Sequence, residues 1–340
     1  MKTREYQYDN LRFLLIALVV LGHLLEVAST FPHKQVIYTV IYSFHMPAFL
    51  FLSGMFARFD RVKWLFGLCL PYLALQSLYI FFARQMYGPG LPLQFSQPYW
   101  LLWYLFALAV YTLMLPVYDL SSPGGRAAMT AAAFLLAVLA GFDQSIGYPW
   151  SASRILVFQP WFLLGFYAGR RGRAGQPPKE RSRGFLLGTA LLTAGTCLVL
   201  EYLLVRSGVP GQVLYGAQSY QAAGGSWEWR VLSMACAGSV ILLLFGVAAR
   251  GLRLRIPVLT TLGQNTLSIY LFHGFVVRFI QNRCSSLLSG PLAVLAVWAA
   301  ILLLLGNPAV GRCTGFLLGA GWYRRLKTKK DGTASPREPG

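Results

Sequence analysis

Residues 12–26, RFLLIALVVLGHLLE, decide the fold prediction. Ten residues without charge separate Arg12 from His23. Eleven steps of an α-helix turn through about 1100°, or three turns plus about 20°, and advance about 16 Å, so both side chains are predicted to share one face. If the helix crosses a bilayer, Arg12 lies at one headgroup layer and His23 near the middle of the hydrocarbon. An ionisable residue at membrane depth is unfavourable, so His23 marks a candidate functional site, with Glu26 beside it three residues further on.

The composition of the whole chain is typical of a polytopic membrane protein. Of its 340 residues, 56% are apolar and only 12% are charged, a balance outside the range of soluble domains. The first apolar run is long enough to span a membrane and has no small-residue cleavage site after it, so we do not expect a cleaved signal peptide. The five cysteines show no CxxC or CxxH spacing, which argues against a disulfide framework and against a zinc site. We therefore expect no metal.

We predict an all-α fold, a polytopic bundle of about ten transmembrane helices, from ten apolar segments. They cover residues 13–31, 36–57, 64–83, 99–118, 127–142, 155–169, 185–205, 231–249, 260–279 and 291–308. Most of the 30 Lys and Arg fall before the first segment, in alternate connections and in the C-terminal tail. By the positive-inside rule, both termini are therefore predicted to be cytoplasmic.

The sequence predicts one membrane domain, residues 1–323, followed by a basic tail, residues 324–340, which we expect to be disordered. Topology explains most of the net charge of +19, because basic loops such as residues 170–183 face the anionic lipid of the cytoplasmic leaflet. No binding to nucleic acid is therefore expected. A second explanation stays open, in which part of this charge attracts a polyanionic substrate from the cytoplasm.

Three of the four histidines, His23, His45 and His273, fall near mid-depth in three different segments. A lone histidine in a membrane helix is more often a packing residue that makes a hydrogen bond, but three at one depth favour a shared polar cavity. The second segment also carries Ser53 and Gly54 near its predicted cytoplasmic end. Small residues at this position allow the close approach of a helix or of a ligand.

These residues resemble the integral-membrane acyltransferase 3 family. The most specific part of the resemblance is the spacing from Arg12 to His23 after Asp9-Asn10, and the likeness covers essentially the whole chain. Within the family, the chain is most similar to the branch of fucose 4-O-acetylase-like sugar O-acetyltransferases. Residues 55–57, MFA, depart from the pattern, because larger members often have Val-Asp there. The remaining matching motifs are Phe44-His45-Met46-Pro47, Phe51-Leu52-Ser53-Gly54, Trp103-Tyr104, Phe162-Leu163-Leu164-Gly165 and LGQNTLSIYLFH at residues 262–273.

The resemblance implies a multi-pass enzyme of the inner, plasma membrane that moves an acyl group, typically acetyl, to a hydroxyl of a carbohydrate or cell-surface glycan. The implied donor is cytoplasmic acetyl-CoA or another acyl-CoA. Arg12 is expected to bind the CoA phosphates, together with Ser53 and Gly54. His23 is expected to act as general base. Glu26 either orients the imidazole, as in a catalytic triad, or lies at the outer headgroup boundary and only solvates the helix end.

We assign His45, Trp103, Tyr104 and His273 to the binding of the acceptor. For the two aromatic residues, an interfacial aromatic belt is the alternative. A one-step transfer and an acyl-histidine intermediate both stay open. The competing class of function is a proton-coupled secondary transporter of a polar solute, which would also use intramembrane histidines and a carboxylate. No inverted repeat is visible in the sequence, and this argues against a transporter.

Overall fold

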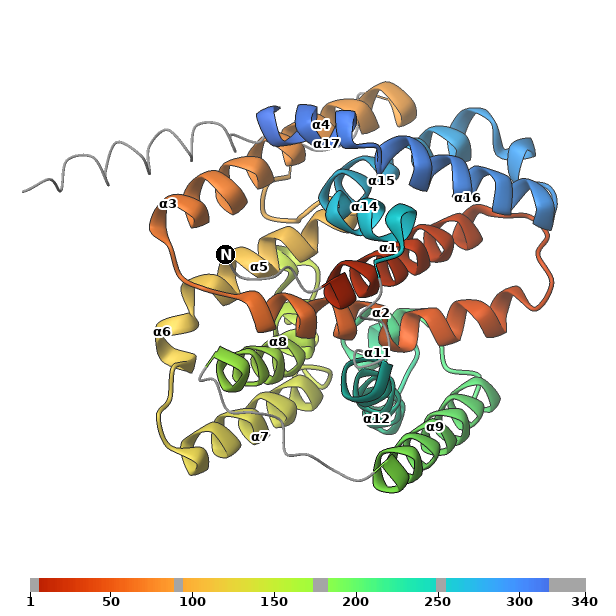
Figure 1. The fold of residues 1–340 in the computed structure, drawn as a ribbon. Coiled ribbons are helices and arrows are strands. Elements are labelled where there is room, and N and C mark those ends of the chain that lie inside the picture. The colour runs from red at the N-terminus through yellow and green to blue at the C-terminus, as the bar shows by residue number, and fades with distance from the viewer. Residues whose placement is uncertain (1–5, 89–93, 174–182, 249–254, 318–340) are drawn as a thin grey trace, which may run out of the picture.

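The structure of the protein, a computed structural model, describes residues 6–88, 94–173, 183–248 and 255–317 (Figure 1). These residues form helices and no strands. The symbol η marks 3₁₀- and π-helices. The elements are α1 (Tyr6–Val27), α2 (Lys34–Phe56), α3 (Arg61–Trp64), η1 (Leu65–Cys69), α4 (Leu70–Tyr87), η2 (Trp100–Leu102), α5 (Trp103–Leu113), α6 (Leu115–Tyr118), α7 (Pro123–Leu139), η3 (Pro149–Ser151), α8 (Ala152–Arg173), α9 (Arg183–Arg206), α10 (Gly211–Tyr215), α11 (Tyr220–Ala223), α12 (Trp227–Ile241), η4 (Leu242–Ala248), α14 (Pro257–Gln264), α15 (Thr266–Arg283), η5 (Ser285–Leu288), α16 (Pro291–Leu305) and α17 (Pro308–Leu317).

The all-α membrane bundle is confirmed. Among the described residues, five helices are long and apolar enough to cross a membrane: α1, α2, the stretch Arg61–Tyr87, Leu187–Arg206 in α9, and Trp227–Gly246. A sixth is obtained if α16 and α17, which are bent by 57°, form one span. Each of the ten predicted segments overlaps a helix or a run of consecutive helices. The number ten and the cytoplasmic position of the termini stay predictions, and the predicted tail at residues 324–340 lies outside the described residues.

Two predicted segments are broken in the structure. The ninth, residues 260–279, consists of α14 and α15, which meet at Asn265. The amide Nδ2 of Asn265 donates to the carbonyl of Thr261 at 2.9 Å, a local side-chain bond that competes with helical backbone bonding. The fourth, residues 99–118, begins with η2 and is divided at Met114. The apolar pattern continues through both breaks, so periodicity alone does not reveal them.

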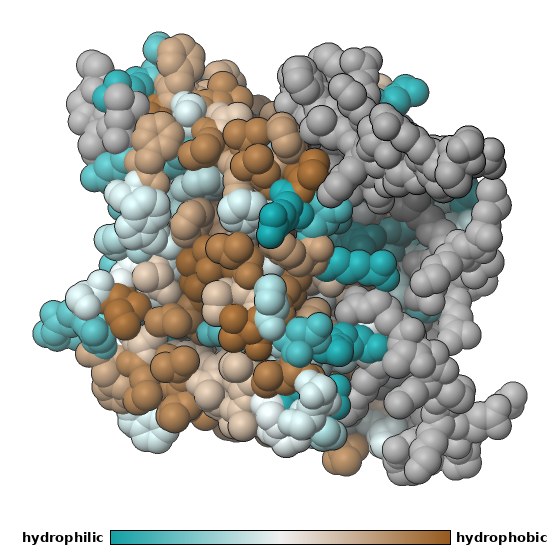
Figure 2. All heavy atoms as spheres, turned by 90° about the vertical axis from the view of Figure 1, so that its left-hand side faces the viewer, coloured by the Kyte–Doolittle hydropathy of each residue, from teal (hydrophilic) through white to brown (hydrophobic). Residues whose placement is uncertain are grey.

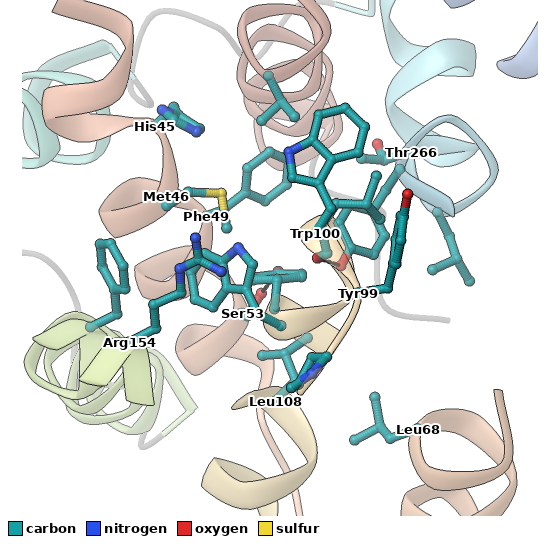
Figure 3. A pocket seen from close by; sticks show the side chains of 18 of the residues that line it. His45, Met46, Phe49, Ser53, Leu68, Tyr99, Trp100, Leu108, Arg154 and Thr266 are labelled. Atoms are coloured by element: carbon teal, nitrogen blue, oxygen red, sulfur yellow. Dashed lines mark hydrogen bonds between the residues drawn. The ribbon is translucent and has the colours of Figure 1, made fainter. Parts of the chain in front are cut away.

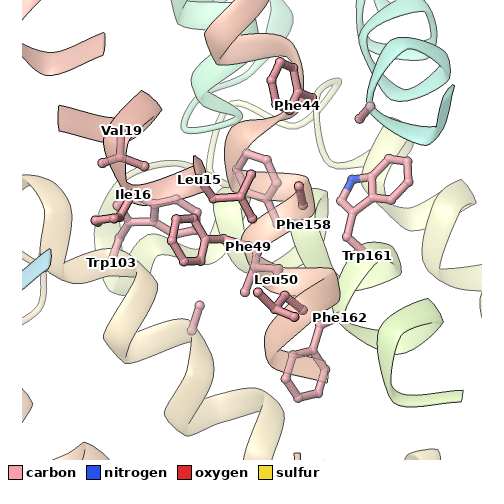
Figure 4. Packing of buried hydrophobic residues seen from close by; sticks show 14 of the residues in the cluster. Leu15, Ile16, Val19, Phe44, Phe49, Leu50, Trp103, Phe158, Trp161 and Phe162 are labelled. Carbon is pink, nitrogen blue, oxygen red and sulfur yellow. The ribbon is translucent and has the colours of Figure 1, made fainter. Parts of the chain in front are cut away.

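The core of the bundle forms where α1, α2, α5 and α8 meet (Figure 4). Leu15 and Ile16 of α1 and Leu50 of α2 are fully buried, and Phe158 and Phe162 of α8 pack against the same cluster. Lipid chains are as apolar as leucine. The bundle is therefore stabilised here through close packing between helices rather than through removal of apolar surface from water.

Helices α2 and α8 approach each other backbone against backbone. A Cβ atom at Gly54 would meet the carbonyl oxygen of Phe162, and one at Gly165 would meet the backbone of Phe51. Small residues at facing positions of two membrane helices allow this close approach. The FLSG motif of α2 and the FLLG motif of α8 are thus the two halves of one helix contact.

The surface of the bundle exposes large apolar side chains. Figure 2 shows the side of the molecule that lies on the left in Figure 1, where brown apolar side chains form a broad area with teal hydrophilic side chains on either side of it. Leu191, Leu192 and Leu198 of α9 are also exposed. Large apolar patches are rare on soluble monomers, whereas they suit contact with lipid chains.

Candidate active site

A cavity of about 960 Å³ lies inside the bundle and follows one face of α1. Its lining includes Arg12, His23 and Glu26. From Arg12 to Glu26 the helix rises about 21 Å, or about two thirds of the thickness of the hydrocarbon core of a bilayer. The volume is at the upper end of the range for ligand pockets, about 300–1,000 Å³. We call its two ends the Arg12 end and the Arg278 end, after the arginines of α1 and α15 that line them.

Arg12 is fixed by contacts with α1 and α2, and α14 holds its partner Asp9. Its Nη1 donates to Oδ1 of the buried Asp9 at 2.9 Å, and its guanidinium lies 5.0 Å from the ring centroid of Phe56. Gln264 of α14 donates to the other carboxylate oxygen of Asp9 at 3.4 Å. Helix α14 comes this close because a Cβ at Gly263 would meet the Asp9 carbonyl oxygen. The Asp9-Asn10 and LGQN motifs therefore meet beside one guanidinium, which keeps 33% of its side-chain surface exposed.

Two further cations, Arg58 and Lys63, line the Arg12 end of the cavity. They come from the connection between α2 and α3 and from α3 itself. Among the described residues that line the whole cavity, Glu26 is the single Asp or Glu. Arg12 is paired with Asp9, but no carboxylate lines this end among the described residues, so the three cations suit the binding of an anion such as a phosphate.

Ser53 and Tyr104 line the cavity, and their hydroxyl oxygens are 2.7 Å apart in a hydrogen bond. Gly54 is predicted from the sequence to contact the donor beside Ser53. In the structure its Cα faces the carbonyl oxygen of Phe162 on α8, and it is not among the described residues that line the cavity. The structure gives Gly54 a packing role instead of the predicted donor contact, because the space beside it is filled by another helix.

His23 is held at its Nδ1 atom by two groups. The hydroxyl of Tyr42 lies 3.1 Å from Nδ1, and Oε1 of Glu26 lies 3.4 Å from it. Tyr42 also donates a short hydrogen bond to Oε1 of Glu26, and the hydroxyl of Tyr38 lies 3.5 Å from the same oxygen. Within the described part of the chain, the other nitrogen, Nε2, makes no hydrogen bond. A carboxylate at one imidazole nitrogen and a free second nitrogen form the arrangement of a positioned general base.

The three predicted histidines come together around this point. The His273 ring stacks on the His23 ring with centroids 5.5 Å apart and an interplanar angle of 24°. His273 is fully buried and does not itself line the cavity; its Nδ1 lies 2.9 Å from the carbonyl of Ile269. His45 lines the cavity (Figure 3) and contacts the ring of Tyr42, with centroids 4.8 Å apart. His23 therefore touches His273 directly and is connected to His45 through Tyr42.

Two arginines beside aromatic rings line the Arg278 end. The guanidinium carbon of Arg278 lies 4.0 Å from the ring centroid of Trp100, whose indole is 4.5 Å from the His23 ring. Arg154 of α8 lies 5.2 Å from the ring centroid of Trp103, and Figure 3 shows it among the side chains around the cavity, with Trp100 on another part of the wall. Trp103, which the sequence assigns to the acceptor, thus contacts an arginine, and its role in acceptor binding stays a prediction.

A sequence model of the acyltransferase 3 family, described as an acyltransferase domain, matches residues 5–311. The chain belongs to the acyltransferase 3 family. The match includes all the cavity residues described above, and membership favours a membrane acyltransferase over the transporter. No curated protein and no solved structure matches the chain.

Several residues of this cavity are not among those predicted from the sequence. Arg154 and Arg278 lie in a connection and near a segment end, where cations are common, and Tyr42 is one of many tyrosines in the apolar segments. A signal for the two arginines did exist, because both fall toward the side that the positive-inside rule leaves poor in cations. Cations on that side need a reason other than topology, and here both line the cavity.

Proposed function

We propose that this membrane acyltransferase, placed in the inner membrane, transfers an acetyl or related acyl group from cytoplasmic acyl-CoA to a hydroxyl of a carbohydrate or cell-surface glycan. The observation that carries the proposal is the single cavity that joins Arg12 at one end to His23 and Glu26 further along α1. The likeness to the fucose 4-O-acetylase-like branch supports a carbohydrate as the acceptor.

The Arg12 end receives the donor. Arg12, Arg58 and Lys63 supply positive charge for the phosphates of CoA, and the planar guanidinium of Arg12 offers forked contacts to a phosphate. Ser53 lies on the cavity wall between this end and His23 and supplies a hydroxyl for hydrogen bonding. From Arg12 the donor extends along α1, so its thioester comes to His23 after a helical rise of about 16 Å.

His23 carries out the proton transfers. Its Nε2 removes the proton of the acceptor hydroxyl while the oxygen attacks the thioester carbonyl carbon. The tetrahedral intermediate then breaks its carbon–sulfur bond, and the leaving sulfur takes the proton from the imidazolium and departs as the thiol of CoA. Glu26, with Oε1 3.4 Å from Nδ1, stabilises the imidazolium. General base catalysis of this kind contributes about 10²- to 10⁴-fold in rate. In the acyl-histidine route, the same Nε2 would instead attack the thioester.

The Arg278 end receives the acceptor. Trp103 and Tyr104 line the cavity, Tyr104 directly beside the donor residue Ser53, and they offer aromatic faces against which a sugar ring packs. His45 lines the cavity beside Tyr42, and His273 lies behind His23 and stacks on its imidazole. Donor and acceptor therefore enter from opposite ends and meet at one imidazole.

The test is acceptor-dependent release of CoA. Protein in lipid nanodiscs is given acetyl-CoA with and without a glycan acceptor, and free thiol is measured. We expect the release to depend on the acceptor, and His23→Ala to abolish it while the protein stays folded. His33→Ala is the matched control, because His33 is exposed and does not line the cavity. Release at the wild-type rate by His23→Ala would remove His23 from the mechanism.

A further inference from the structure

The Arg278 end of the cavity has an excess of positive charge. Arg154 and Arg278 line it, and Glu26 is the only carboxylate among the described lining residues. Glu26 directs its Oε1 toward His23 and Tyr42, and no ion pair joins it to either arginine within the described part of the chain. Two guanidinium groups thus face the acceptor end without a carboxylate paired to them.

Arg154 is oriented by neighbours that leave its terminal nitrogens free. Its Nε donates to the carbonyl of Tyr215 at 3.3 Å, and its guanidinium carbon lies 5.2 Å from the ring centroid of Trp103 and 5.6 Å from that of Tyr148. Neither Nη atom makes a hydrogen bond within the described residues. Aromatic faces and one carbonyl fix the plane of the guanidinium, so its two terminal amino groups are presented together to a planar anion.

Arg278 carries a buried donor without a partner. Its Nη1 donates to Gln281 at 2.7 Å, while its Nε is buried and finds no hydrogen-bond acceptor among the described residues. A buried N–H group without an acceptor destabilises a structure. A bound anionic oxygen would supply the missing acceptor and also neutralise the charge.

Trp100 links Arg278 to the proposed catalytic base. Its backbone φ is 34°, a left-handed value that is unfavourable for a bulky residue and that occurs mostly at functional sites. In this conformation the indole contacts the His23 ring at 4.5 Å and the Arg278 guanidinium at 4.0 Å. An anion bound by Arg278 is therefore separated from the His23 imidazole by about the width of the Trp100 indole. This separation suits a hydroxyl and an anionic group carried on one sugar residue or on two adjacent ones.

We propose that the acceptor is an acidic glycan, in which the molecule that carries the reacting hydroxyl also carries a carboxylate or a phosphate. Arg278 and Arg154 bind that anion while His23 meets the hydroxyl. The inference rests on the proposed function, because that function places the acceptor at the Arg278 end. A neutral sugar can offer a hydroxyl oxygen to the buried Nε of Arg278 but leaves the guanidinium charges without an anion, so the site favours an anionic acceptor.

The experiment measures binding without any donor. Purified protein in nanodiscs is titrated with methyl β-D-glucuronide, glucose 6-phosphate and methyl β-D-glucoside, and the shift in thermal unfolding temperature is recorded. The first two probes distinguish a carboxylate from a phosphate, and the third is the neutral match of the first. We expect at least one anionic probe to bind about 10- to 100-fold more tightly than the glucoside, as hydrogen bonds to a charged group predict. Equal shifts for all three probes, including no shift, would overturn the proposal.

Variants then assign the preference to residues. Arg278→Gln and Arg154→Gln are each expected to remove most of the preference for the anionic probe. Arg206→Gln is the matched control, because this exposed arginine at the end of α9 does not line the cavity. A preference that persists in both arginine variants would contradict the assignment. The binding experiment contains no acyl-CoA, so its result does not depend on acyl transfer. A failure of acyl transfer in the assay of the proposed function would refute that function alone. Equal acylation of acidic and neutral glycans would refute this inference alone.

Discussion

Replacing Glu26 by glutamine tests whether the carboxylate acts through His23. Glutamine keeps the size and the hydrogen-bonding capacity but removes the charge. Oε1 lies 3.4 Å from Nδ1 of His23, where a full pair of unit charges interacts by about 5 kcal/mol at an effective dielectric constant of about 20. If about half of the imidazolium charge has developed in the transition state, about 2.5 kcal/mol is lost, or about 70-fold in kcat. Both side chains are partly exposed, at 13% and 25%, so we expect a loss of about 10- to 100-fold after screening.

The assay is acceptor-dependent release of CoA at saturating donor, with the amount of inserted protein and its unfolding temperature compared first. The donor KM should stay within about twofold of the wild-type value, because Glu26 contributes in the transition state and not to donor binding. Tyr38→Phe is the control, since its hydroxyl lies 3.5 Å from the same Oε1 without bonding to His23; we expect a loss below about threefold. A kcat within threefold of wild type in folded Glu26→Gln would show that Glu26 only solvates the end of α1.

Three further predictions concern the donor, the packing and the topology. Arg12→Ala should raise the donor KM more than it lowers kcat, because a phosphate contact is equally strong in the ground and transition states. Arg12→Lys should recover only part of the donor affinity. An unchanged donor KM in steady-state kinetics would refute the phosphate contact. Gly54→Ala should lower the unfolding temperature through a loss of about 1–3 kcal/mol of stability, because its Cβ meets the backbone of α8. Gly188→Ala should not, since a Cβ there has nothing within 4 Å. Equal effects of the two variants would contradict the close contact. Cysteine introduced at exposed Gln221 should react with an impermeant thiol reagent from outside the cell, whereas cysteine at exposed Ser121 should not. The reverse pattern would show that the predicted topology is inverted.

The sequence predicts α1 and the face that lines the cavity well. A period of 3.6 residues places Arg12, His23 and Glu26 on nearly one side, and the cavity follows that side. The partners of that face could not be predicted, because the register of α2 against α1 depends on packing. Gly22 is one determinant of this register, since a Cβ there would come within 3.0 Å of the ring of Tyr42. The hydroxyl that holds His23 thus depends on the absence of a side chain one residue away.

Two other features could not be read from the sequence for a different reason. A small residue in a membrane helix permits the approach of either a ligand or another helix, so Gly54 alone could not decide between them. The facing Gly165 on α8 decides in favour of a helix. Arg278 lies near the end of the predicted segment 260–279, where a cation needs no functional explanation, and its position over Trp100 in the structure shows that it faces the cavity.

Arg12 and His23 belong to one uninterrupted helix, Tyr6–Val27, and this makes α1 a molecular ruler. No hinge lies between the arginine that we propose to bind phosphate and the imidazole, so their separation along the axis is fixed at about 16 Å. Under the proposed function, we therefore expect the enzyme to select donors by the length of the chain between phosphate and thioester. A compact donor such as acetyl phosphate is too short to touch both residues. Insertion of one residue into residues 13–22 would turn His23 by about 100° away from the Arg12 face, and would uncouple donor binding from transfer without removing either side chain.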